Sequence, residues 1–62
     1  YRTIIYQLNK DEVFTIEGYD ILFKKQQDTV RGCECMTLNG NSAGCIVTLP
    51  GTMIAKREQY VH

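Results

Sequence analysis

Turn-forming sequences divide this chain into short segments, and that division restricts the fold more than any other feature. The turn sequences lie at residues 9–12, 24–28, 39–40 and 50–51, with a further break at Gly18. The segments between them are rich in β-branched and aromatic residues and alternate in polarity, which is typical of β-strands. We therefore expect an all-β chain.

The N-terminal half predicts two or three strands. In the first, Ile4, Tyr6 and Leu8 lie on one face because side chains alternate along a strand. Residues 13–23 also alternate, but the parity of the apolar positions changes at Gly18. A glycine accommodates a bulge or sharp bend at low cost, so we expect two strands or one strongly bent strand here.

The second half predicts a hairpin. Residues 24–28 are expected to form a charged loop, and residues 29–38 a further strand. The dipeptide at 39–40 is Asn-Gly, a strong signal for a hairpin turn, with residues 44–49 returning alongside. Pro50-Gly51 suits the centre of a type II turn, with glycine at positive φ.

The C-terminal segment, residues 52–60, lacks alternation and contains mostly good helix formers, with Thr52 available as an N-cap. We expect a short strand or turn that runs into a short C-terminal helix. The predicted architecture is a single domain over residues 1–62, a small five-stranded β-barrel or meander.

All three cysteines fall within residues 32–45. Cys33 and Cys35 share a strand face, whereas the place of Cys45 depends on the loop: a two-residue loop sets it opposite Glu34, and a three-residue loop opposite Cys35. The Cys-x-Cys spacing is not that of a zinc site, and an odd count does not suit a secreted disulfide scaffold. We expect reduced, mostly buried thiols, no metal and a cytoplasmic location.

Composition argues against several functions. The 62 residues carry seven basic and seven acidic side chains, which disfavours indiscriminate binding to nucleic acid or membranes, and no apolar run could span a bilayer. His62 and Ser42 are the only residues of their kinds and lack catalytic partners, so we expect neither an enzyme nor a cofactor. A small core with exposed sheet edges predicts a homo-oligomer.

The segment "LPGTMIAKREQY" resembles the closing segment of the carbon storage regulator family, in which a proline turn leads through a short strand to Arg-Glu-Glu at a helix start. The matching positions are Pro50, Arg57, Glu58 and Gln59. Residues 11–21 are loosely similar to the family's polar turn and second strand. The family forms a small, intertwined β dimer that binds messenger RNA at loop GGA motifs. Two features depart from it: residues 4–9 contain no basic residue, and the hairpin at 32–45 has no counterpart.

The resemblance implies that Arg57 contacts a base or a phosphate, with Lys56 beside it. Together with Arg2, these are the predicted nucleic-acid-binding residues of a small regulator of RNA or single-stranded nucleic acid. The alternative is a protein-binding module, such as a phage or host factor, that docks on a larger protein through a sheet edge or a Tyr-rich face. The zero net charge and an exposed edge favour this alternative about as strongly as the first hypothesis is favoured.

Overall fold

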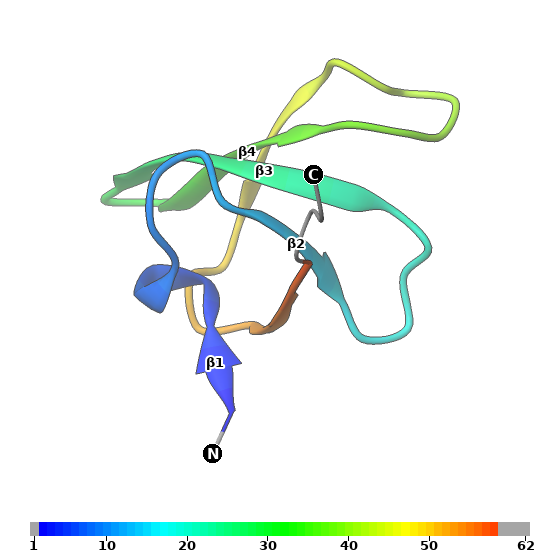
Figure 1. Cartoon of the computed structure of the whole chain (residues 1–62). Coiled ribbons are helices and arrows are strands. Elements are labelled where there is room, and N and C mark those ends of the chain that lie inside the picture. The colour runs from blue at the N-terminus through cyan, green and yellow to red at the C-terminus, as the bar shows by residue number, and fades with distance from the viewer. Residues whose placement is uncertain (1, 59–62) are drawn as a thin grey trace.

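A computed structural model describes residues 2–58 (Figure 1). Within this range the elements are β1 (Thr3–Ile4), the 3₁₀ turn η1 (Ile5–Gln7), β2 (Val13–Ile16), β3 (Leu22–Thr29), β4 (Gly32–Thr37), β5 (Ile46–Leu49) and β6 (Ile54–Arg57). The strands form one antiparallel sheet in the order β1-β6-β2-β3-β4-β5. The all-β prediction is confirmed, with six strands rather than five.

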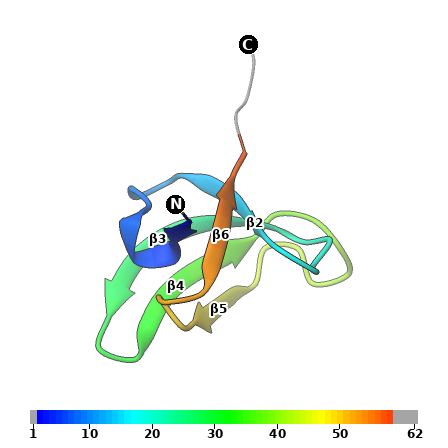
Figure 2. The same cartoon turned by 90° about the horizontal axis from the view of Figure 1, so that it is seen from below.

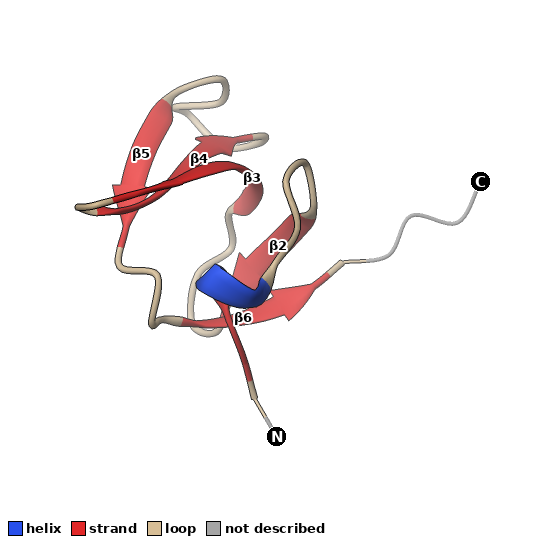
Figure 3. Cartoon of the chain, turned by 90° about the vertical axis from the view of Figure 1, so that its left-hand side faces the viewer, coloured by secondary structure: helices blue, strands red, loops and turns tan. Residues whose placement is uncertain are grey.

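The sheet curls around a common core without closing, so β1 and β5 remain its edges (Figure 3). Phe14 of β2 and Phe23 of β3 are paired across the strands, and their stacked rings lie 5.5 Å apart at the centroids. The other buried apolar residues are Ile5, Leu8, Ile16, Cys33, Cys35 and Ala55. A core this small leaves little stability in reserve.

The predicted N-terminal strand is wrong beyond Ile4. The backbone N–H of Ile5 donates to Met53 O at 3.1 Å, and then the N–H of Leu8 donates to Ile5 O at 3.0 Å, which closes η1. A 3₁₀ turn advances about three residues per turn, so residues three apart share a side. Ile5 and Leu8 are therefore buried, whereas Tyr6 is exposed.

The two strands predicted around Gly18 are confirmed: Gly18 adopts a φ of 87° in the turn between β2 and β3. The predicted charged loop at residues 24–28 is wrong, because these residues belong to β3. A bulge between Lys25 and Gln27 shifts the register with β4, and the chain reverses at Val30 and Arg31 instead. The polar segment stays in the sheet because Lys25, turned inward, finds oxygen partners there.

The predicted hairpin is confirmed as β4 and β5, but its turn is wider than Asn39-Gly40. The N–H of Thr37 donates to Cys45 O at 2.9 Å, so the loop spans residues 38–44 and projects away from the η1 side (Figures 1 and 2). The side chain of Asn39 instead accepts the N–H of Leu22 at 2.9 Å. Cys45 lies opposite Thr37, so neither register predicted for it occurs.

The predicted type II turn is also wrong. The N–H of Met53 donates to Pro50 O at 3.1 Å, which makes Pro50 the first residue of the turn, and Gly51 does not have a positive φ. A Cβ at Gly51 would collide with the ring of Tyr6, so glycine is needed for that close approach. The chain then runs as β6, and the N–H of Glu58 still donates to Val13 O at 3.0 Å. The expected helix has no part within residues 52–58, and residues 59–62 lie outside the described range.

Candidate nucleic-acid interface

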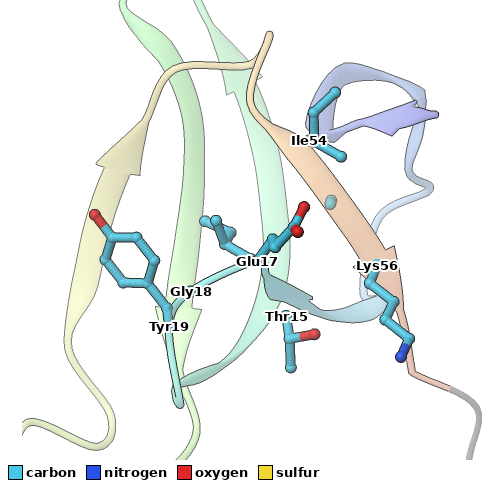
Figure 4. Close-up of a pocket in the computed structure, with 8 residues that line it drawn as sticks. Thr15, Glu17, Gly18, Tyr19, Ile54 and Lys56 are labelled. Atoms are coloured by element: carbon cyan, nitrogen blue, oxygen red, sulfur yellow. The ribbon is translucent and has the colours of Figure 1, made fainter.

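The outer face of β2 and β6 carries a groove of about 420 Å³ (Figure 4). Its labelled lining residues are Thr15, Glu17, Gly18, Tyr19, Ile54 and Lys56. A second depression of about 410 Å³ adjoins it, shares Glu17, Ile54 and Lys56, and extends to Arg2 and Arg57. The two form one continuous surface at the β1–β6–β2 end of the sheet.

Antiparallel pairing places two of the predicted binding residues together. Thr3 pairs with Ala55, so the register continued by one residue sets Arg2 beside Lys56. Lys56 pairs in turn with Thr15 of β2. Paired residues point to the same side of a sheet, so Arg2, Lys56 and Thr15 form one row across the outer face.

The electrostatic setting of the two cations differs. The guanidinium of Arg2 lies 3.5 Å from the carboxylate of Glu17, and both side chains are exposed, so this pair contributes only about 0–1 kcal/mol. Lys56 makes no ion pair with any residue in the range 2–58. Neighbouring like charges repel, which leaves the ammonium of Lys56 favourably placed for an anionic ligand.

Arg57, which the resemblance singles out, points away from that row. It pairs with Phe14 and turns to the inner side of β6, where its Nε donates to Glu12 Oε2 at 2.8 Å. A further bond runs from its Nη2 to Gln7 O at 3.4 Å. The N–H of Asn9, followed by Arg57, holds the pKa of Glu12 below its usual value. Arg57 thus ties the turn before β2, and η1, to β6.

A third basic residue, Lys25, has a structural position that the sequence analysis missed. It is only 3% exposed, and its Nζ donates to Leu8 O at 2.7 Å, Ile5 O at 3.0 Å and Tyr6 O at 3.3 Å. The same nitrogen lies 2.9 Å from Asp28 Oδ1. Lys25 therefore anchors the η1 carbonyls to β3. The available signal was parity, because Lys25 follows the buried Phe23 by two positions.

Two cysteines of β4 lie beside Lys25 and Asp28 of β3. The thiol of Cys33 donates to Asp28 Oδ1 at 3.1 Å, and burial raises the pKa of both Cys33 and Cys35 to about 11. Bonds from Lys25 and then Cys33 lower the pKa of Asp28. The expectation that Cys33 and Cys35 are unpaired and buried is confirmed, whereas Cys45 is exposed. Thiols of such high pKa are poor nucleophiles at neutral pH.

Within residues 2–58, no three His, Cys, Asp or Glu side chains are close enough to hold a metal ion together. The same part of the chain has no helix long and apolar enough to cross a membrane. Comparison of the chain with protein-family models, curated proteins and solved structures gave no match.

Proposed function

We propose that this protein is a small non-enzymatic regulator that binds RNA or another single-stranded nucleic acid through the outer face of β1 and β6. The observation that carries the proposal is the row formed by Arg2 and Lys56, which come from opposite ends of the chain. Adjacent cations attract a phosphate backbone, and Tyr19 in the adjoining groove offers a ring on which a base can stack.

The resemblance at residues 50–60 supports the same pair of strands. In the carbon storage regulator family, RNA contacts come from the first strand and from the arginine that matches Arg57. Here β1 and β6 are hydrogen-bonded neighbours. Arg57 joins the contact only by exchanging Glu12 for a phosphate, and its partly exposed ion pair is weak enough to permit that exchange.

The test is a fluorescence anisotropy titration of labelled single-stranded RNA at several salt concentrations. For single strands the slope of log K against log salt is about −0.7 per phosphate contact, so Lys56→Ala and Arg2→Ala should each lower affinity and flatten the slope by about 0.7. Lys24→Ala is the matched control, because Lys24 lies on β3, outside the groove. An absence of binding at low salt, or an equal loss in the control, would contradict the proposal.

A second candidate is protein docking through the same groove. The groove is lined by one carboxylate, Glu17, and one cation, Lys56, and Tyr19 and Ile54 expose apolar surface there. Such a mixed lining suits a peptide segment better than a polyphosphate. Glu17→Gln separates the two candidates: it should strengthen binding of RNA, by removing a repelling charge, and weaken binding of a protein that pairs with the carboxylate.

The proposal includes a cytoplasmic location and a homo-oligomer. Buried, unpaired Cys33 and Cys35 suit a reducing compartment. The edge strands β1 and β5 offer backbone groups that a partner could cover.

A further inference from the structure

The outer edge of β5 presents a short and well-defined set of free backbone groups. The N–H of Thr37 donates to Cys45 O at 2.9 Å, so the alternation of an antiparallel ladder turns the N–H and C=O of Val47 and Leu49 toward β4. The N–H and C=O of Ile46 and Thr48 therefore point away from the sheet. Neither residue has a backbone partner on that side within the described part of the chain.

No free backbone N–H continues this edge at either end. The N–H of Gly44 already donates to Thr37 O at 2.7 Å. Pro50 has no N–H, and its carbonyl accepts the N–H of Met53 at 3.1 Å. The open donors and acceptors are thus the two N–H and two C=O groups of Ile46 and Thr48, with Val47 between them.

The edge also lacks the charges that commonly protect exposed strands. Residues 35–55 contain no charged side chain, although the chain as a whole has fourteen. Ile46 is 53% exposed, and Val47 and Leu49 are only partly buried against the core. Met36 lies beside Ile46 on the outer face and continues the apolar surface. A solvent-exposed edge of this kind is prone to pair with another strand.

We propose that the β5 edge pairs with β5 of a second copy of this chain, in an antiparallel, two-fold symmetric dimer. The axis passes beside Val47, so Val47 faces its own counterpart, and Ile46 bonds to Thr48 of the second copy. This register satisfies all four free backbone groups of Ile46 and Thr48 on each edge. A longer foreign strand finds no further N–H donor on this edge, because the N–H of Gly44 is already bonded and Pro50 has none.

Charge also favours a second copy as the partner. A symmetric contact brings each side chain close to its own counterpart, so a charged edge would repel itself, whereas this edge carries no charge. The pairing would cover Val47 and Leu49 and enlarge a core that is small for a stable domain. β5 lies at the opposite end of the strand order from β1 and β6, so Arg2 and Lys56 stay free in the dimer.

The test is sedimentation equilibrium of the whole chain over a range of concentrations. The wild type should be a dimer, and Ile46→Lys should be monomeric because the two introduced ammonium groups lie diagonally across the contact and repel each other. Ile54→Lys is the matched control: Ile54 is an exposed isoleucine of β6, and its replacement should leave the dimer intact. Circular dichroism of each variant checks that it is folded.

A second pair of variants tests the backbone register. Thr48→Pro removes an N–H that points away from β4, so it should raise the dimer dissociation constant about tenfold or more, since each dimer loses two bonds. Thr48→Ala keeps the N–H and should change it little. In a mixed sample of labelled and unlabelled chains, an NOE between the two Val47 Hα protons is expected. A monomeric wild type or an open-ended assembly would overturn the proposal. So would a dimer whose dissociation constant changes with neither Ile46→Lys nor Thr48→Pro.

Discussion

β3 and β6 each carry two adjacent cations, and each strand divides its pair between the two sides of the sheet. Lys25 and Arg57 turn inward and bond to oxygens of the η1 region, whereas Lys24 and Lys56 turn outward. Successive side chains of a strand point to opposite faces, so the two cations of each pair have different surroundings. The inward cations hold the fold, and the outward cations are available to a ligand.

The two inward cations differ in depth, and depth determines how much each contributes to stability. Lys25 is almost fully buried among carbonyl oxygens, so removing it takes hydrogen bonds from carbonyl groups that water does not reach. The Arg57 side chain is 45% exposed, so water can replace Glu12 as its partner. The predictions below test this difference, beginning with the largest expected effect.

Replacing Lys25 by methionine should have the largest effect. Lys25→Met keeps a long apolar side chain but leaves Leu8 O without a donor and removes one of the two donors to Ile5 O, so we expect a loss of about 3 kcal/mol in unfolding free energy. Lys24→Met, the matched control on the outer face, should stay within about 0.5 kcal/mol of the wild type. Urea denaturation measures both. Equal losses in the two variants would remove the distinction between inward and outward cations.

The contact between the Tyr6 ring and Gly51 tests whether packing against the turn after β5 also holds η1 in place. Gly51→Ala sets a methyl group against the Tyr6 ring and should destabilise the fold by about 1–3 kcal/mol. The double variant with Tyr6→Ala should recover part of that loss, because the ring is then absent. Thermal unfolding of the three variants checks this. A Gly51→Ala variant of wild-type stability would show that η1 can move away from the turn at residues 50–53.

The inward position of these cations is one feature that the sequence alone does not predict. Alternation correctly predicted an all-β chain, the turn at Gly18 and the β4–β5 hairpin. It missed the inward role of Lys25, because polar residues 24–28 look like a loop unless their oxygen partners, distant in sequence, are known. It also misjudged Gly51, whose role depends on the ring of Tyr6. Arg2 and Lys56 were predicted separately, but only the register of β1 with β6 places them together.

Arg57→Ala should reduce the free energy of unfolding by about 0.5 kcal/mol, since a partly exposed ion pair contributes little. Glu12→Gln should cost a similar amount, and the double variant should cost less than the sum because both single changes remove one interaction. Lys56→Ala should leave stability unchanged. A double-mutant cycle by urea denaturation measures the coupling; strictly additive losses would show that the pair is not formed in solution.

The smallest expected effect concerns acid. The lowered pKa values of Glu12 and Asp28 mean that the unfolded chain binds more protons than the native protein near pH 4. Their stabilising contribution is therefore present at neutral pH and is lost as the pH falls below about 4. Glu12→Gln and Asp28→Asn should each flatten the acid limb of a stability–pH profile. An unchanged limb in both variants would rule out these bonds as its cause.

The division of the cations is tested most directly by labelling lysines in the native protein with an amine-reactive ester and locating the labels by mass spectrometry. Lys10, Lys24 and Lys56 should react readily, whereas Lys25 should stay protected until denaturant unfolds the chain, because its ammonium is enclosed by Ile5 O, Leu8 O and Asp28. Labelling of Lys25 at the rate of its neighbour Lys24 would contradict the account.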